Sequence, residues 1–412
     1  MGSIPASSPF SNLSVIPLDP HYALKELFNA DHDPKKVILG SGVYRDDNSK
    51  PWVLPSVKKA EELVDQAQDS ARYEYLPITG YAPFYNAARD LLFGPFDEKA
   101  VHVVSLHTIS GTGANHLGAR FLSDALRPSS VWLSDPSWVN HANIWGLVGV
   151  TVKLYPYWNR EKRVLDFEKM IEKLETEAAT GDVIVLHACA HNPTGVDPTK
   201  EQWKRIAEVC EKRALFPFFD CAYQGFATGD LDEDAWAVRH FVERGTLEIA
   251  VAQSFSKNMG LYGERVGAFH LVTASPDSAA KAKGHLTRLQ RGQISQPPTR
   301  GSKLATTILT NPRLFQEWLA DLREMSSRIK NMRKALYEEL LSLGTPGTWD
   351  HIVSQIGMFS YTGLSPEQVA TVQTDNHVYI LKSGRISVAG LNTKNVKHVA
   401  EGIDAAVRKW PS

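Results

Sequence analysis

The sequence of 412 residues has little of several features that mark specialised classes of protein. Its three cysteines, Cys189, Cys210 and Cys221, lie in or beside apolar segments without metal-type spacing, which predicts buried thiols in a reducing compartment. The formal net charge is only -1, so no general attraction to nucleic acid or to an anionic membrane is expected. No apolar stretch reaches about 18 residues, so a membrane span is not expected. The first 24 residues lack Lys and Arg, which argues against a secretory signal or transit peptide and makes the cytoplasm the expected location.

What the sequence does contain is an alternation of apolar runs and amphipathic segments. The runs Val183 to Leu186 and Leu215 to Phe219 have the length of buried strands, and a helical pattern separates them. Repeated units of this kind predict an α/β fold with a mainly parallel sheet covered by helices. After Asn311-Pro312 the apolar residues recur at helical spacing as far as Gly344, which predicts one long amphipathic helix. The segment beyond about residue 345 is expected to form a smaller second domain.

Three polar residues follow three successive strand candidates. They are Asn192, Asp220 and Lys257, and the third comes soon after the run Leu247 to Val251. Sites in open α/β sheets form beyond the carboxyl ends of strands, so we expect these side chains at one edge of the sheet. A Lys and a carboxylate placed there suit a carbonyl cofactor with a pyridine nitrogen. Taken singly, Lys257 could be a surface residue of a polar loop and Asp220 a strand-end cap.

A small-residue segment, Ser110-Gly111-Thr112-Gly113, precedes a helical stretch and could bind a phosphate through its backbone N–H groups. Its spacing does not match a dinucleotide fingerprint, and no acidic residue follows at the required distance. Ser254 and Arg265, on either side of Lys257, could complete the phosphate site. His187, His191 and Cys189 invite comparison with a metal site, but no fourth ligand is evident; a packed His187 and no metal are expected.

Several longer motifs carry a more specific signal. They are residues 42–47 (GVYRDD), 75–80 (YLPITG), 110–114 (SGTGA), 187–195 (HACAHNPTG), 219–226 (FDCAYQGF), 253–258 (QSFSKN), 355–360 (QIGMFS) and 383–385 (SGR). With these motifs the chain resembles the aspartate aminotransferase family, of the fold type I pyridoxal-phosphate enzymes, from about Leu18 to Ile403. The resemblance implies a large domain with a mainly parallel seven-stranded sheet and a smaller α+β domain built from both ends of the chain. The expected division is an arm at 1–20, small-domain segments at 21–50 and 313–412, the latter including an interdomain helix, and a large domain at 51–312.

The resemblance also implies roles by position. Lys257 would form the Schiff base with pyridoxal 5'-phosphate and move the proton, Asp220 would pair with the ring nitrogen, and His141 would orient Asp220. Tyr75 would reach the phosphate of a neighbouring subunit, which implies a homodimer with shared sites. The remaining implied residues are Asn192 and Tyr223 at the ring oxygen, Trp138 on the ring, Ser110, Gly111, Thr112, Ser254 and Arg265 at the phosphate, Gly42, Trp138 and Asn192 beside the substrate, Arg385 at its α-carboxylate, and Arg291 at its distal carboxylate across the dimer.

Some positions depart from the family pattern. Ser41 replaces an apolar residue, Gly263 and Gln296 each replace an Asn, and Ile294 replaces an aromatic residue. Arg385 and Arg291 imply that L-aspartate and 2-oxoglutarate give oxaloacetate and L-glutamate in ping-pong half-reactions. The departures favour the alternative of a relative diverted to another amino acid or to lyase, decarboxylase or cyclase chemistry. Retention of Lys257, Asp220 and Arg385 together argues against a catalytically silent binding protein.

Overall fold

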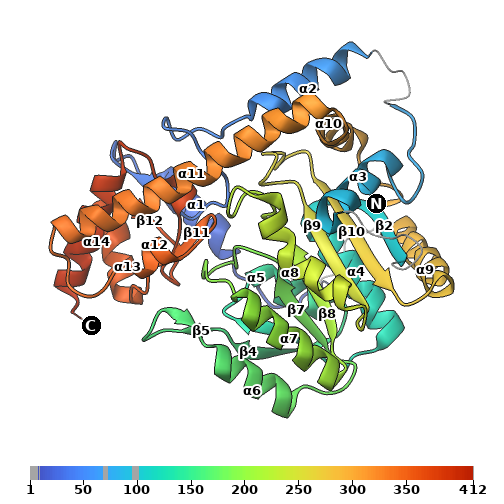
Figure 1. Cartoon of the computed structure of the whole chain (residues 1–412). Helices are drawn as coiled ribbons and strands as arrows, with labels where there is room; N and C mark the ends of the chain where they lie inside the picture. The colour runs from blue at the N-terminus through green and yellow to red at the C-terminus, as the bar shows by residue number, and fades with distance from the viewer. Residues whose placement is uncertain (1–7, 9, 68–72, 95–101, 412) are drawn as a thin grey trace.

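The computed structural model of the chain describes residue 8 and residues 10–67, 73–94 and 102–411. A seven-stranded sheet forms its centre (Figure 1). The strands, in spatial order, are β2 (His102–Ile109), β10 (Val266–Thr273), β9 (Ile249–Ser254), β8 (Phe216–Cys221), β7 (Val183–His187), β3 (Ser130–Asp135) and β4 (Thr151–Pro156). Only β10 runs antiparallel to its neighbours, so the expected mainly parallel α/β fold is confirmed.

Helices cover both faces of this sheet, and side chains alternate between the two faces along each strand. In β7, Val183 and Val185 pack on one side in a cluster with residues of α4, α5 and α9. Ile184 and Leu186 pack on the other side with residues of α6, α7 and α8. The covering helices are α4 (Ser110–Leu126), α5 (Val139–Leu147), α9 (Pro276–Ile294), α6 (Phe167–Glu177), α7 (Lys200–Arg213) and α8 (Leu231–Arg244). Burial on both faces explains why these strands are almost wholly apolar.

A long helix, α11 (Pro312–Ser342), crosses from the sheet region to a smaller group of elements (Figure 1). The Asn311 side chain caps its first turn by accepting from the backbone N–H groups of Arg313 and Leu314. The predicted long helix is therefore confirmed, and Gly344 follows it with a positive φ of 61°. Against α11 pack α2 (Pro55–Gln66), α10 (Thr299–Thr310), α12 (His351–Ser354), η2 (Val388–Gly390) and α14 (Val396–Lys409). Helix α3 (Ala82–Phe93) packs on α10, and α13 (Pro366–Asn376) packs on α14.

The two ends of the chain meet in the smaller group. Strand β1 (Val37–Ile38) pairs in parallel with β12 (Val378–Tyr379), and Leu39 O accepts the backbone N–H of Ser387. Nearby, β11 (Phe359–Tyr361) pairs with β13 (Arg385–Ser387). The first helix, α1 (Pro20–Ala30), lies beside this pairing, and a small hairpin, β5 (Trp158–Asn159) with β6 (Val164–Leu165), projects from the sheet region. Segments more than 300 positions apart in sequence thus form one wall beside the sheet.

Candidate active site

A cavity of about 810 Å³ lies where the carboxyl ends of β7, β8 and β9 approach the paired chain ends. Two sets of residues from different parts of the fold line it. We call the first set the strand-end face, defined by Ser110, Asp220, Ser254 and Lys257. We call the second set the clamp face, defined by His21, Gly40, Phe359 and Arg385. The topology of the sheet thus produces the crevice in which open α/β proteins bind their ligands.

Lys257 follows β9 by three positions and presents its amine to this cavity. Its Nζ lies 5.2 Å from the centre of the Tyr223 ring. Burial lowers the pKa of the Lys257 amine, and the charge of Asp220 opposes that shift only in part. A lowered pKa increases the unprotonated fraction, which is the form that attacks a carbonyl carbon.

Asp220 lies in β8 and is paired with a buried imidazole. Its Oδ2 is 2.8 Å from Nε2 of His141, whose Nδ1 lies 3.0 Å from the Ser137 hydroxyl. Burial alone would raise the pKa of Asp220, but the hydrogen bond and charge of His141 and the charge of Lys257 hold it below the ordinary value. Asp220 therefore remains a carboxylate, as a partner for a protonated ring nitrogen must be.

His187, behind this pair, is a packed neutral imidazole. Burial lowers the pKa of His187 to about 3. Its Nδ1 accepts the backbone N–H of Asn192, and its ring stacks on that of His191 at 4.2 Å. The Ser137 hydroxyl lies 3.4 Å from Nε2, so both ring nitrogens have a neighbouring group. Within the described part of the chain no cluster of three or more His, Cys, Asp or Glu side chains has the arrangement of a metal site.

The phosphate-type segment differs in one respect from its expected form. Helix α4 begins at Ser110 itself, so Gly111 and Thr112 belong to its first turn instead of to a preceding loop. The predicted position of the helix start is therefore corrected. The corrected position favours an anion site, because the N–H groups of a first helical turn have no partner within the helix. The hydroxyls of Ser110 and Ser256 lie 2.9 Å apart at the same place.

Small residues are required for this convergence. A Cβ added to Gly111 would lie 2.8 Å from Cβ of Ser254, and one added to Gly267 would lie 2.4 Å from the carbonyl carbon of Ser110. Arg265 brings a guanidinium to the same cavity, and its backbone O accepts the N–H of Ser110. First-turn amides, hydroxyls and a cation together fit a phosphate group.

Arg385 brings a buried guanidinium to the clamp face. Its Nη2 donates to Gly40 O at 2.7 Å, its Nη1 donates to Asn192 Oδ1 at 3.3 Å, and its guanidinium lies 4.0 Å from the Phe359 ring centre. Burial lowers the pKa of Arg385 to about 10, so the group stays charged near neutrality. Its Nε is buried and has no hydrogen-bond partner among the described residues. A buried cation with an unused N–H suits a carboxylate ligand.

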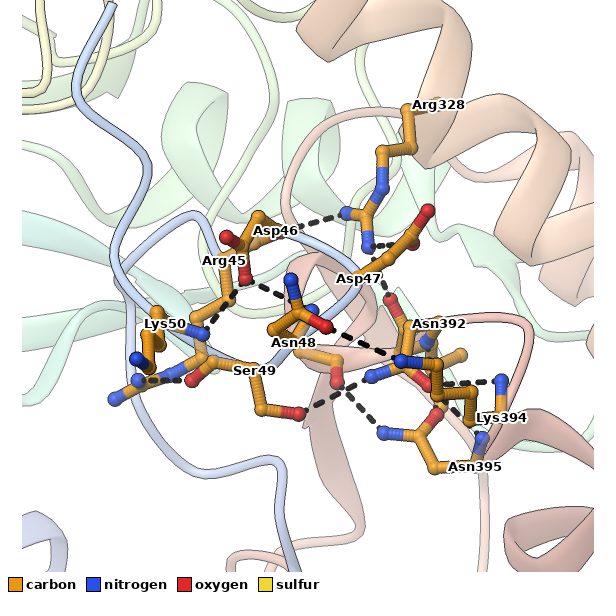
Figure 2. Close-up of polar contacts among 12 residues, drawn as sticks. Arg45, Asp46, Asp47, Asn48, Ser49, Lys50, Arg328, Asn392, Lys394 and Asn395 are labelled. Atoms are coloured by element: carbon orange, nitrogen blue, oxygen red, sulfur yellow. Dashed lines mark hydrogen bonds and ion pairs between the residues drawn. The ribbon is translucent and has the colours of Figure 1, made fainter.

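Residues 41–43 and 45 line the cavity, and Arg328 of α11 contacts the loop that continues from them to residue 50 (Figure 2). Arg328 donates to Arg45 O at 2.8 Å, to Asp47 Oδ1 at 2.9 Å and to Leu391 O at 3.1 Å. In Figure 2 the side chains of Asn392 and Lys394 reach the same loop, at Ser49 and Asn48. The loop that carries Gly42 is therefore held by the helix that joins the two groups of elements.

Most of the predicted site residues meet in this one cavity. Ser41 also lines it, so the departure from the family pattern at that position faces the site. A Cβ added to Gly42 would lie 3.3 Å from Phe359 Cζ, so a larger residue there would crowd that ring. The predicted residues that line the cavity are Gly42, Ser110, Gly111, Thr112, Trp138, His187, Asn192, Asp220, Tyr223, Ser254, Lys257, Arg265 and Arg385.

Three predicted residues lie outside the cavity lining, and one of them, His141, contacts the lining residue Asp220. Tyr75 is 81 % exposed, and Arg291 is an exposed residue of α9 whose guanidinium donates to the Ser295 hydroxyl. Neither is part of the cavity lining within this chain. Ile294 lines a second cavity of about 430 Å³, which shares Thr112 and Arg265 with the first.

Sequence reasoning missed the contribution of the first helix. His21 and Lys25, one turn apart in α1, both line the main cavity, as does Arg45 of the loop. Asp19 and Pro20 do signal a helix start, since the Asp19 side chain accepts the N–H of His21. Nothing in the local pattern indicates which distant group that helix will face.

A cavity that combines a strand-end Lys, a paired carboxylate, a phosphate-type helix start and a carboxylate clamp defines a pyridoxal-phosphate enzyme that acts on amino acids. The family model described as "Aminotransferase class I and II" matches residues 34–403, and the chain belongs to this family. It is therefore an aminotransferase that uses pyridoxal phosphate.

Relatives of known name agree with this assignment. The chain is 48% identical over 408 residues to an L-tyrosine:2-oxoglutarate aminotransferase of Aspergillus ustus, covering 96% of this chain and 78% of that protein. It is 47% identical to the cytoplasmic aspartate aminotransferase of Schizosaccharomyces pombe, over 98% of this chain and 99% of that protein.

Solved structures give the same result. The cytoplasmic aspartate aminotransferase of Saccharomyces cerevisiae superposes with a TM-score of 0.94 at 43% identity, covering 98% of this chain and 99% of that one. An aromatic-amino-acid aminotransferase of Burkholderia pseudomallei, covalently bound to pyridoxal phosphate, superposes with a TM-score of 0.93 at 40% identity, covering 97% and 100%.

Proposed function

We propose that the protein transfers the amino group of L-aspartate to 2-oxoglutarate, giving oxaloacetate and L-glutamate. The observation that carries this proposal is the single cavity in which the Lys257 amine faces the buried Arg385 guanidinium. An amine of lowered pKa and a carboxylate-binding cation are the two groups that an α-amino acid needs at its Cα and at its carboxylate. The names of the Schizosaccharomyces and Saccharomyces relatives support aspartate as the donor.

The cofactor, when bound, supplies a carbonyl carbon for the amino group and a ring that withdraws electrons. We propose that Lys257 holds the cofactor covalently. After the substrate amine has displaced it, the free Lys257 amine would take the proton from the substrate Cα. Asp220, oriented by His141, keeps the ring nitrogen protonated. Asn192 and Tyr223 donate to the ring oxygen, and Trp138 covers the ring. The phosphate is held by Ser110, Gly111, Thr112, Ser254 and Arg265.

On the substrate side, Arg385 binds the α-carboxylate through its unused N–H groups, and Asn192 and Gly42 border the same space. These assignments use groups that already face the cavity, so binding needs no rearrangement of the sheet. The small α+β domain, with its segments at 21–50 and 313–412, would then carry the clamp face, and the large domain at 51–312 would carry the strand-end face.

We also propose a homodimer with shared sites. Tyr75 and Arg291 lie away from the cavity of their own chain, which is the arrangement expected if each serves the other subunit. Tyr75 would reach the phosphate, and Arg291 would bind the distal carboxylate of the substrate.

The names of the yeast relatives support a cytoplasmic location. Separately, within the described residues no helix has both the length and the apolar character needed to span a lipid bilayer.

A second candidate donor is L-tyrosine. The Aspergillus relative, 48% identical to this chain, is named for that amino acid. Three departures from the family pattern are compatible with a donor other than aspartate. They are the polar Ser41 in the cavity wall, and Ile294 and Gln296 in the segment that follows Arg291. The two donors share the α-carboxylate clamp and differ only at the distal end of the side chain.

The deciding experiment records the absorbance of the cofactor-loaded protein while L-aspartate is added without any oxo acid. Conversion of the cofactor to its amine form, with an equal amount of oxaloacetate released, is expected. Conversion by L-tyrosine but not by L-aspartate would replace the donor. A product other than a 2-oxo acid, identified by mass spectrometry, would replace transamination with a lyase, decarboxylase or cyclase reaction.

A further inference from the structure

His21, near the start of α1, touches the Arg385 guanidinium. Its Nδ1 lies 3.3 Å from Arg385 Nη2 and 3.2 Å from Gly40 O. The Nη2 group itself donates to Gly40 O at 2.7 Å. The imidazole is partly buried and lines the cavity next to the clamp.

The protonation state of His21 follows from these neighbours. Arg385 is a permanent donor, and Gly40 O already accepts one of its N–H groups. An unprotonated Nδ1 is therefore the form that gives the second Nη2 hydrogen an acceptor. Burial and the Arg385 charge lower the pKa of His21, with Asp19 and the Gly40 carbonyl acting in the opposite direction, so the neutral ring is favoured.

The remaining contacts of Arg385 show what this acceptor adds. Asn192 holds Nη1, Phe359 supports the face of the guanidinium, and Nε has no partner. With Gly40 O, these contacts limit the movement of the guanidinium, but they supply an acceptor for only one of the two Nη2 hydrogens. A second acceptor on the same nitrogen limits this movement further, so less side-chain freedom is lost when a carboxylate binds to the N–H groups that remain free.

We propose that His21 is a positioning residue for substrate binding: its Nδ1 accepts an N–H of Arg385 and fixes the plane in which the guanidinium meets the substrate α-carboxylate. This inference rests on one part of the proposed function, namely that the substrate is an α-amino acid; it does not require that the donor be L-aspartate. It predicts a role in the KM of every donor and acceptor and little role in the chemical step. Because His21 belongs to α1, it also couples the first helix to the site.

The test compares His21→Leu with His21→Asn, two side chains of matched branching, of which only Asn offers an oxygen acceptor near the position of Nδ1. In the cofactor-loaded protein, His21→Leu is expected to raise the KM for L-aspartate and for 2-oxoglutarate by about fivefold to tenfold, the loss of one hydrogen bond to a charged group. The kcat is expected to stay within about twofold, and His21→Asn is expected to restore the KM to within about twofold of the unsubstituted value. Glu26→Ala, on the exposed side of the same helix, serves as the control for general disturbance of α1.

Binding of succinate, an unreactive dicarboxylate, is measured by calorimetry on the same variants, so that the result does not depend on turnover. The dissociation constant is expected to rise in His21→Leu and not in His21→Asn. An unchanged KM and unchanged succinate binding in His21→Leu would overturn the proposal, as would loss of binding in His21→Asn equal to that in His21→Leu. If the unsubstituted protein turns over L-tyrosine and not L-aspartate, the proposed donor fails, and the His21 comparison is made with L-tyrosine and 2-oxoglutarate.

Discussion

The strand-end face and the clamp face meet in one cavity but are built in different ways. Residues of the strand-end face come from strands that are nearly all buried and from one helix start, all between positions 110 and 257. Residues of the clamp face come from both ends of the chain, and Arg385 contacts Gly40 across 345 positions. The first face depends on the packing of one sheet, whereas the second depends on the docking of distant segments. Substitutions on the first face should therefore lower kcat, and substitutions on the second should raise KM.

The largest effect is expected for Asp220→Asn, on the strand-end face. The neutral amide cannot hold a proton on the ring nitrogen, so kcat should fall by about 100-fold or more, with a much smaller change in KM. Steady-state kinetics with L-aspartate and 2-oxoglutarate measure both. His141→Asn removes one of the groups that hold Asp220 ionised and oriented, and it should lower kcat by less; a loss larger than that of Asp220→Asn would contradict the direct role of the Asp220 carboxylate.

Arg385→Lys, on the clamp face, is expected to rank second. Lysine keeps the charge but cannot make a bidentate contact, and its ammonium cannot lie flat on Phe359. The KM for both substrates should rise by about 10-fold to 100-fold, and kcat should fall less. A fall in kcat at unchanged KM would contradict the assignment of substrate binding to the clamp face and of the chemical step to the strand-end face.

Arg328→Ala tests the brace behind the clamp face and should have a moderate effect. Loss of its contacts to Arg45 O and Leu391 O should lower the free energy of unfolding by about 1 kcal/mol and raise KM by a few-fold. Urea denaturation and steady-state kinetics provide the two readings. Lys394→Ala, which loses only an exposed contact to Asn48, should change neither.

The smallest effect concerns the ionic contact between the end of α1 and the start of β12. His377 Nδ1 lies 2.8 Å from Asp31 Oδ2, and this hydrogen bond raises the pKa of His377 above its ordinary value of 6.5. The stabilisation is therefore complete below that value and is lost as pH rises through the raised pKa. His377→Gln should lower Tm slightly at about pH 5.5 and not at about pH 9, whereas His32→Gln, on the exposed neighbouring loop, should show no such difference. An equal loss at both pH values would exclude the ionic contact.

The strand-end residues were predictable because each follows an apolar run. Asn192, Asp220 and Lys257 share an edge for the simple reason that parallel strands end on the same side. The start of α4 was predicted less well, since Ser110 was expected to precede the helix and in fact begins it. Arg385 was recognised through its motif and not through its surroundings, and its contact with His21 was not predicted.

The sequence by itself determined the sheet, the long helix and the residues that follow the strands, because periodicity and strand direction are local properties of the chain. Only the tertiary structure decided which distant groups face one another. The pairing of β1 with β12 brings Gly40 to Arg385, and the packing of α1 beside that pair brings His21 to the same guanidinium. Such contacts depend on side-chain packing between segments more than 300 positions apart, and no local pattern records that packing.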